Sequence, residues 1–239
     1  MKVVVSVGGS VLAPDLDPER VAAHAEVLEA LSADGHRVGV VAGGGKTARQ
    51  YIHVARDLGA NEIELDYLGI GATRMNARLL IAALSEDRVT RPAPDYETAA
   101  EQLRTGGFAV MGGTSPGQTT DAVSAAFAEY VDADLLVLAT SVDGVYDADP
   151  KEHADAEKFD SLTAGGLLDV VGDLEMTAGV AAPIDLLAAK IVQRSGMRTV
   201  VIDGRDPERV ERAIRTGEHE GTDVVPVDGN EDPPEWGGD

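Results

Sequence analysis

The sequence predicts an α/β protein whose mostly parallel central sheet is covered by helices on both faces. Short apolar runs, among them residues 3–7 and 38–42, recur along the chain, and segments with helical periodicity follow them. Continuous apolar runs are typical of strands buried on both faces, and their alternation with helices is typical of parallel sheets. The length of 239 residues allows one large domain with a full hydrophobic core.

The first half of the chain shows the alternation clearly. Residues 3–7 are the first expected strand, and Asp17 and Pro18 supply an N-cap and a first-turn proline for a helix through about Ser32. Residues 38–42 form the second expected strand. The next expected elements are a helix over 46–58 ended by Gly59, a helix over 66–84, a central strand over 108–111 and a helix to about 131.

The second half continues the pattern and ends in an acidic tail. Its expected elements are a strand over 135–139, a polar excursion over 152–160, helices over 162–171 and 184–195, a strand over 200–202 and a helix over 207–216. Residues 228–239 are acidic and rich in proline and glycine, so they cannot bury enough apolar surface to offset the entropy lost on ordering. We expect them to be disordered unless Trp236 docks them.

The composition excludes several classes of function. The chain has 42 acidic and 20 basic residues, and its net charge of −22 disfavours binding to nucleic acid and to anionic membranes. It has no cysteine, which excludes disulfides and thiolate chemistry. No apolar run approaches the roughly 18 residues that span a bilayer, and the N-terminus has the pattern of a strand, not of a signal segment. We therefore expect a cytoplasmic protein.

The acidic excess also predicts adaptation to salt. With only five lysines, the composition is similar to that of proteins from salt-loving organisms. Concentrated salt screens the repulsion among carboxylates, since the Debye length falls to roughly 3 Å at 1 M. The fold should weaken in dilute buffer; the alternative is an ordinary acidic protein.

Three glycine turns that follow apolar runs mark the candidate site. They are Gly8-Gly9-Ser10, Gly43-Gly44-Gly45-Lys46, and the hydroxyl-rich stretch 112–121, which precedes a helical pattern. Backbone N–H groups at such turns, with the positive end of the following helix dipole, favour anions. Together they predict a site for several phosphates. The spacing does not match a P-loop, because position 40 is Val40, and no dinucleotide-binding fingerprint is present.

Six segments, in this order, carry a resemblance to a known family. They are residues 7–12 (VGGSVL), 42–49 (AGGGKTAR), 66–77 (DYLGIGATRMNA), 112–121 (GGTSPGQTTD), 139–150 (ATSVDGVYDADP) and 184–190 (IDLLAAK). Over residues 1 to about 227 the chain resembles uridylate (UMP) kinases of the archaeal type, in the amino-acid kinase superfamily. The resemblance implies a three-layer α/β/α sandwich in a single domain, 1–227. Its part to about 131 would bind the nucleoside monophosphate, and its part over about 132–227 would bind ATP.

The resemblance also implies the reaction and the assembly. Phosphoryl transfer from Mg·ATP to UMP would give UDP and ADP in pyrimidine nucleotide synthesis, in a homohexamer. The ATP phosphates would carry the Mg²⁺, with no metal ligand from the protein. The five histidines have no metal-ligand spacing.

The same resemblance assigns the binding residues. ATP would contact Gly9, Ser10, Gly45, Arg49 and, around its adenosine, Thr140, Tyr146 and Asp149. UMP would contact Gly44, and the ribose hydroxyls of UMP would bind Asp66. The rest of UMP would be surrounded by the turn made of Thr114, Ser115, Pro116, Gly117, Gln118, Thr119 and Thr120.

Lys46, Asp121 and Arg49 are the predicted catalytic residues. In related kinases the aspartate that matches Asp121 organises cationic groups at the transfer site. This chain departs from many superfamily members in having Ser6 and Pro183 where they have lysines. We expect Lys46 to supply the missing charge with help from Arg74, although a place for Arg74 at a subunit interface is an equal alternative.

Other interpretations remain open at this stage. Asp66 could be a helix N-cap, Tyr146 a half-buried aromatic, and Asp149 an ordinary turn residue. Sister kinases act on acetylglutamate, carbamate, aspartate or isopentenyl phosphate. The fold also serves non-catalytic nucleotide or metalate binders, as in molybdenum storage proteins.

Overall fold

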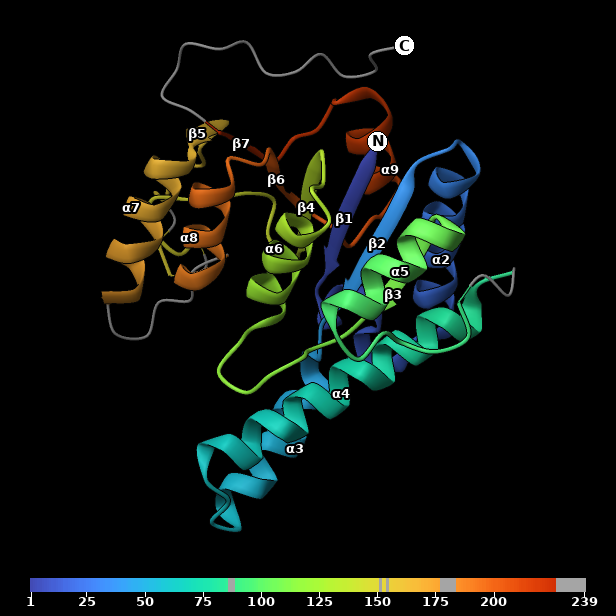
Figure 1. Ribbon diagram of the computed structural model, residues 1–239. Helices are drawn as coiled ribbons and strands as arrows, with labels where there is room; N and C mark the ends of the chain where they lie inside the picture. Colours follow the sequence, from blue (N-terminus) through green and yellow to red (C-terminus); the bar gives the residue numbers. More distant parts are fainter. Residues whose placement is uncertain (86–88, 151, 154, 177–183, 227–239) are drawn as a thin grey trace.

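The computed structural model describes residues 1–85, 89–150, 152–153, 155–176 and 184–226. Within them one seven-stranded sheet has the order β3-β2-β1-β4-β6-β7-β5 (Figure 1). Its strands are β1 (Lys2–Val7), β2 (Arg37–Ala42), β3 (Phe108–Met111), β4 (Leu135–Thr140), β5 (Ser161–Thr163), β6 (Thr199–Asp203) and β7 (Thr222–Val225). All neighbouring strands are parallel except β6 and β7.

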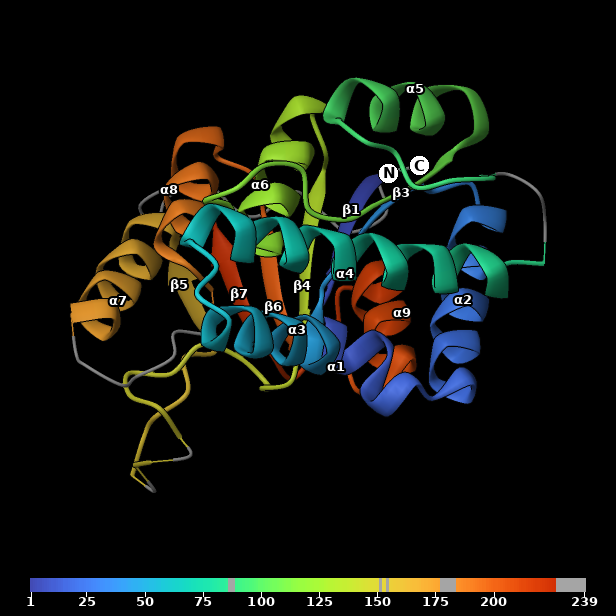
Figure 2. The ribbon, with the colours of Figure 1, turned by 90° about the horizontal axis from the view of Figure 1, so that it is seen from below.

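Helices cover both faces of this sheet, as the two ribbon views show (Figures 1 and 2). One face carries α2 (Pro18–Ala33), α9 (Pro207–Thr216) and the C-terminal part of α4 (Glu62–Ala83). The other carries α5 (Tyr96–Gly106), α6 (Thr120–Tyr130), α7 (Ala164–Met176) and α8 (Leu186–Ser195). The short α1 (Gly9–Leu12) and α3 (Gly45–Asp57) complete the helices described below. The predicted three-layer fold with a mostly parallel sheet is confirmed.

The alternation along β1 explains how the sheet orients its side chains. Val3, Val5 and Val7 enter the hydrophobic core beneath α2, whereas Val4 enters the core beneath α6. Successive side chains of a strand point to opposite faces. Ser6 therefore points to the same face as Val4, toward α6.

The strand over residues 108–111 was expected to be central, and this expectation is wrong. β3 lies at the edge of the sheet, beside β2 alone among the strands. Its residues are nevertheless buried, because α5 packs on it and residue Ala93 forms a parallel bridge with Met111 along its outer side. A covered edge strand has the same apolar pattern as a central strand, so the sequence does not separate them.

The boundaries of three expected helices change. Residues 161–163 form β5, parallel to β7, and the helix expected from residue 162 begins at Ala164. The helix expected from Asp66 begins at Glu62, because Asn61 and Glu64 form a capping box. Asp66 is therefore not an N-cap. The helix expected from residue 184 begins at Leu186, with Asp185 as its N-cap.

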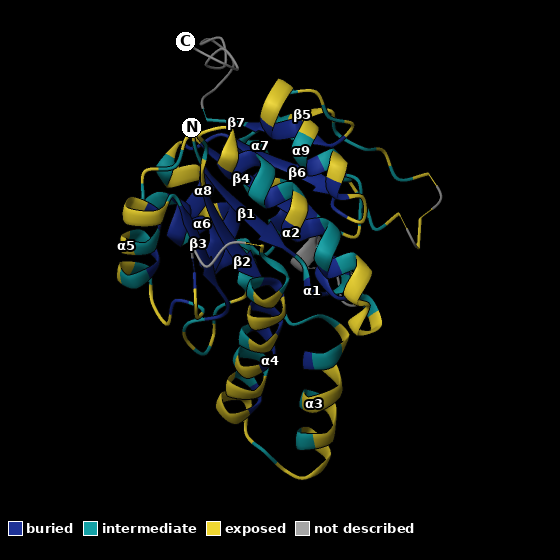
Figure 3. Cartoon of the chain, turned by 90° about the vertical axis from the view of Figure 1, so that its right-hand side faces the viewer, coloured by how far each residue is buried: buried dark blue, intermediate teal, exposed yellow. Residues whose placement is uncertain are grey.

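Helices α3 and α4 pack side by side and project from the body of the molecule (Figure 3). Large apolar side chains remain exposed on this pair, which we call the α3–α4 arm. They are Tyr51, Val54, Leu58, Ile63, Tyr67, Leu68, Met75 and Leu79. A concentration of large exposed apolar side chains on one part of a fold favours an interaction site there.

Pro183 and the tail over residues 228–239, which includes Trp236, lie outside the described residues. Within the described ranges, no helix combines the length and the apolar character needed to cross a membrane.

Candidate active site at the carboxyl ends of the strands

The candidate site lies where the parallel strands end. Val7 of β1 is in register with Ala42 of β2 and with Ala139 of β4, so the segments that follow these strands leave the sheet at one edge. Open α/β sheets bind ligands at this edge. The three glycine turns found in the sequence therefore converge in space.

The first two turns touch through their backbones. A Cβ atom on Gly9 would lie 2.3 Å from the backbone nitrogen of Gly45, and Gly45 itself has a φ of +61°. Only glycine fits such an approach. α3 begins at Gly45, so its free N–H groups and the positive end of its dipole face this junction. This contact between Gly9 and Gly45, which we call the glycine junction, provides backbone donors and positive potential for an anion.

Arg49 adds a side-chain cation to this junction. It lies one turn into α3, and its Nη2 donates to Ser10 Oγ over 3.2 Å. Four of the residues predicted to contact ATP, namely Gly9, Ser10, Gly45 and Arg49, are therefore brought together.

The third turn closes onto helix α4. The backbone N–H of Gly117 donates to Asp66 Oδ2 over 2.7 Å, and the Thr114 hydroxyl donates to Gln118 Oε1 over 3.1 Å. Thr119 ends the turn by accepting the N–H of Ala122 as the N-cap of α6. The residues predicted to contact UMP thus share one surface, with Ser115 and Gly117 exposed at the crest of the turn and Pro116 and Thr120 half-buried.

Asp121 lies at the inner end of this turn, against β1. Its Oδ1 accepts the Ser6 hydroxyl over 3.1 Å. Burial first, and then the negative charge of Asp185, raise its pKa from 3.8 to about 6, although the Ser6 hydrogen bond opposes the shift. Asp185 caps α8 and also accepts the hydroxyl of Thr119. Two carboxylates therefore lie near one another at the centre of the site.

The predicted cations do not pair with Asp121 in the described residues. Lys46 Nζ instead contacts Asp15 Oδ1 at 2.5 Å, and both side chains are largely exposed. Arg74 Nε donates to the carbonyl of Gly113 over 3.1 Å, and its Nη2 donates to the carbonyl of Pro94. The position of Lys46 at the start of α3 still leaves its flexible side chain close to the glycine junction.

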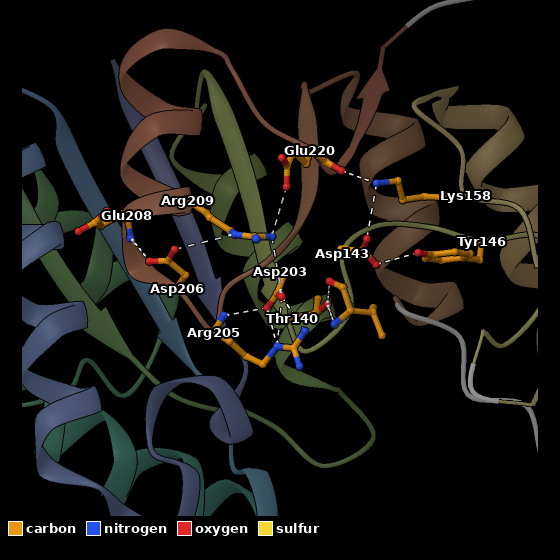
Figure 4. Close-up of polar contacts among 11 residues, drawn as sticks. Thr140, Asp143, Tyr146, Lys158, Asp203, Arg205, Asp206, Glu208, Arg209 and Glu220 are labelled. Carbon is orange, nitrogen blue, oxygen red and sulfur yellow. Dashed lines mark hydrogen bonds and ion pairs between the residues drawn. The ribbon is translucent and has the colours of Figure 1, made fainter. Parts of the chain in front are cut away.

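The end of β4 and the segment that follows it carry the residues predicted to contact adenosine, and Figure 4 shows two of them, Thr140 and Tyr146. Thr140 ends β4, and its hydroxyl is engaged with the backbone of Val142. Tyr146 donates its hydroxyl to Asp143 Oδ1 over 2.8 Å, and Lys158 forms an ion pair with the same carboxylate. The carbonyl of Asp149 accepts N–H groups from residues 152 and 153, which is the geometry of a turn.

Sequence reasoning missed a pair beside this segment, Asp203 and Arg205. Asp203 is the register partner of Thr140, is only 8% exposed, and accepts both Nε and Nη2 of Arg205. These hydrogen bonds hold the pKa of Asp203 below its ordinary value. The signal was available, since Asp203-Gly204-Arg205 follows an apolar run as the other glycine turns do.

A parallel sheet edge with converging glycine turns, a helix N-terminus and fixed arginines defines an α/β protein built to bind phosphorylated ligands. Comparison with known proteins agrees with this class. The chain matches the family model described as the amino acid kinase family over residues 1–203. It belongs to the amino acid kinase family, and the superfamily resemblance found in the sequence is confirmed.

Relatives within this family are similar over nearly the whole chain. The uridylate kinase of Halobacterium salinarum is 62% identical over 226 residues, which cover 95% of this chain and 94% of that protein. The uridylate kinase of Halorubrum lacusprofundi is 60% identical over 238 residues, with 100% and 98% covered. The crystal structure of uridylate kinase from Archaeoglobus fulgidus has a TM-score of 0.85 and 45% identity, and covers 94% of this chain and 100% of its own.

Proposed function

We propose that the protein is a UMP kinase, a phosphotransferase that moves the γ-phosphoryl group of Mg·ATP to UMP and releases UDP and ADP. The observation that carries the proposal is the hydrogen bond between Asp66 and Gly117. It joins a carboxylate suited to ribose hydroxyls to a hydroxyl-rich turn, beside the glycine junction. The relatives named uridylate kinase support this acceptor over those of the sister kinases.

The chemistry follows from this arrangement. Phosphoryl transfer needs positioning of the two oxygens in line with phosphorus, and stabilisation of charge on the moving group. An oxygen of the UMP phosphate forms the new bond to the γ-phosphorus, the bond from that phosphorus to the bridging oxygen breaks, and ADP leaves. Gly9, Ser10, Gly45 and Arg49 hold the ATP phosphates, while Gly44 and the third turn hold the UMP phosphate.

The remaining predicted residues bind the two nucleosides. Thr140, Tyr146 and Asp149 line the adenosine pocket, and the turn over residues 114–120 surrounds uracil and ribose together with Asp66. Because Arg205 is fixed by Asp203 next to Thr140, it places a cation beside the ATP side of the site.

Magnesium enters with ATP, and the residues present fit it. Mg²⁺ prefers oxygen ligands and is usually bound through phosphates and one or two carboxylates. The ATP phosphates would carry the ion, and Asp121 and Asp185 would place two carboxylates near it at the centre of the site. Burial first, and then the charge of Asp185, raise the pKa of Asp121, and a nearby cation would offset that negative charge. When bound, the ion neutralises charge on the transferred phosphoryl group.

Lys46 is the side chain that we assign to the bridging charge. It pairs with Asp15 at the surface, where an ion pair is worth at most about 1 kcal/mol. Phosphate in the junction would compete for this lysine at little cost. Asp121 then orients the cations, and Arg49 contacts the transferred group.

The assembly and the environment belong to the same proposal. The exposed apolar side chains of the α3–α4 arm support a homo-oligomer, which we take to be a hexamer. The net charge of −22, and relatives that are halophiles, support a salt-adapted protein that works in the cytoplasm. The single domain over residues 1–227 performs the whole reaction.

The test is ADP release from Mg·ATP with UMP, CMP, AMP, acetylglutamate and isopentenyl phosphate as separate acceptors, in dilute buffer and in concentrated KCl. We expect turnover with UMP, mainly in concentrated KCl. Turnover with acetylglutamate or isopentenyl phosphate instead would move the protein to a sister activity. ATP binding without ADP release would favour a non-catalytic binder, for which the lysines missing at Ser6 and Pro183 are the motivating observation.

A further inference from the structure

Helix α4 contacts both turns that would hold the two phosphates being joined. Two of its polar side chains are almost fully buried where the turns meet the helix: Thr73 is 6% exposed and Asn76 is 3% exposed. Buried polar groups are costly unless they are hydrogen-bonded. Their partners therefore indicate what these side chains do.

Asn76 holds the turn that follows β2. Its Nδ2 donates to the carbonyl of Gly43 over 2.7 Å and lies 3.4 Å from the carbonyl of Gly44. These residues lead directly into the N-terminus of α3, where the junction with Gly9 forms.

Thr73 holds the turn that follows β3. Its Oγ1 accepts the backbone N–H of Gly113 over 2.7 Å and donates to the carbonyl of Ile70 over 2.7 Å. A Cβ atom on Gly112 would lie 2.6 Å from this hydroxyl, so the turn and the helix are in direct contact. A Cβ atom on Gly44 would lie 3.4 Å from the methyl carbon of Thr73, so this one side chain lies beside both turns.

Arg74 strengthens the second contact. Its Nε donates to the carbonyl of Gly113, the same residue whose backbone N–H is bound by Thr73. Both polar groups of Gly113 are therefore bound to adjacent residues of α4.

We propose that Thr73, Arg74 and Asn76 form a clamp that sets the separation between the donor and acceptor phosphates, and thereby act as positioning residues in the transfer. The inference rests on the proposed function. Transfer requires the reacting atoms about 3 Å apart and in line, and a misplacement of about 1 Å can lower the rate about 100-fold. Loss of the clamp should thus affect turnover more than the binding of either nucleotide alone.

Two substitutions of Thr73 separate its contacts. Thr73→Val keeps the methyl group against Gly44 but leaves the buried N–H of Gly113 without its partner. Thr73→Ser keeps the hydroxyl and removes the methyl group. We expect Thr73→Val to lower kcat at least about 10-fold, while the Kd for UMP alone and for ATP alone changes less than about 3-fold. Thr73→Ser should restore kcat to within about 3-fold of the unsubstituted chain.

Thr105→Val is the matched control, because Thr105 lies on α5, away from both turns, and its hydroxyl donates to the carbonyl of Glu101 over 2.7 Å. It should leave kcat unchanged. Should Thr73→Val fail to fold, Arg74→Met tests the same contact from a half-buried side chain.

Amide hydrogen exchange over residues 108–121 gives a readout that does not depend on activity. Thr73→Val should speed exchange in this segment at least about 10-fold, while Thr73→Ser and Thr105→Val should not. Unchanged exchange and unchanged kcat in Thr73→Val would overturn the clamp. Weaker binding of both UMP and ATP by Thr73→Val, together with a lower Tm, would also overturn the clamp, since that pattern means general destabilisation. If the unsubstituted chain shows no UMP-dependent ADP release, the proposed function fails, and the exchange result alone decides the clamp.

Discussion

Asp121 is a residue whose negative charge the folded protein opposes. Folding raises its pKa from 3.8 to about 6, so the folded protein takes up a proton between these two pH values. The contribution of this group to the free energy of unfolding is therefore lost as the pH rises through about 6. Asp121→Asn keeps an acceptor for Ser6 and removes the charge. We expect it to raise the free energy of unfolding by roughly 2 kcal/mol near pH 7.5, after allowance for partial solvent exposure.

The same substitution should lower UMP-dependent turnover at least about 100-fold, because the cations lose the group that organises them. Urea unfolding at about pH 5 and pH 7.5, beside a turnover assay, checks both effects. If Asp121→Asn is less stable than the unsubstituted chain at about pH 7.5, the electrostatic interpretation of this carboxylate is refuted.

Lys46 tests the assignment of the bridging charge. We expect Lys46→Met to lower kcat about 100-fold with little change in stability, since its only described ion pair, with Asp15, is exposed. Asp15→Asn is the control, because it removes the same ion pair and keeps the lysine. Near-normal turnover in Lys46→Met would show that another cation carries the charge.

His24, on α2, makes a pH-dependent contribution to the free energy of unfolding. It is 2% exposed, and burial first, then the charge of Arg20, lower its pKa from 6.5 to about 4. The neutral form is favoured by folding, so this contribution is present above pH 6.5 and is lost as the pH falls toward 4. Between about pH 7 and pH 4.5, the free energy of unfolding of the unsubstituted chain should fall by roughly 2–3 kcal/mol more than that of His24→Leu. Parallel pH profiles of unfolding for the two proteins would contradict this.

The α3–α4 arm is the element that we expect to mediate assembly. Leu58 is 83% exposed and Tyr67 is 61% exposed. The double variant Leu58→Glu with Tyr67→Glu should lower the molecular mass measured by light scattering in concentrated KCl, because it places charge in an apolar contact. Tyr130→Glu, at a comparably exposed position on α6, should not. A monomeric unsubstituted chain, or an unchanged mass in the double variant, would refute the role of the arm.

Some helices and strands could be predicted from the sequence and others could not. Buried runs such as residues 3–7 and 135–139 were predicted as strands and are strands, because a run buried on both faces leaves little ambiguity. α5 and β7 were not anticipated, since α5 is mostly polar and β7 has only four residues. The edge position of β3 depends on what packs against its outer side, which no local pattern records.

The site was predictable only where a local sequence pattern marks it. Glycine turns after apolar runs located Gly9, Gly45 and the turn that contains Thr114, and the structure brings these turns to one edge. The burial of Thr73 and Asn76 against those turns was not predictable, because it follows from the packing of a distant helix. The pairing of Lys46 with Asp15 was likewise hidden, since it spans 31 positions of the chain.

At the scale of the whole molecule, the net charge of −22 should make stability depend on salt. Repulsion among carboxylates destabilises the compact state, and KCl screens it as the Debye length falls from about 10 Å at 0.1 M to about 3 Å at 1 M. We expect Tm to rise by at least about 10 °C between about 0.1 M and 2 M KCl. Sucrose of equal osmolality controls for general exclusion effects. A Tm that does not respond to KCl would indicate an ordinary acidic protein.

The central claim is that the converging turns transfer a phosphoryl group from ATP to UMP. The most direct measurement is the identification of the nucleotide products after incubation of the purified chain with Mg·ATP and UMP in concentrated KCl. The account predicts UDP and ADP in equal amounts, and none when UMP is omitted. Bound ATP with no UDP at any salt concentration would contradict the claim and would make the protein a nucleotide binder without transferase activity.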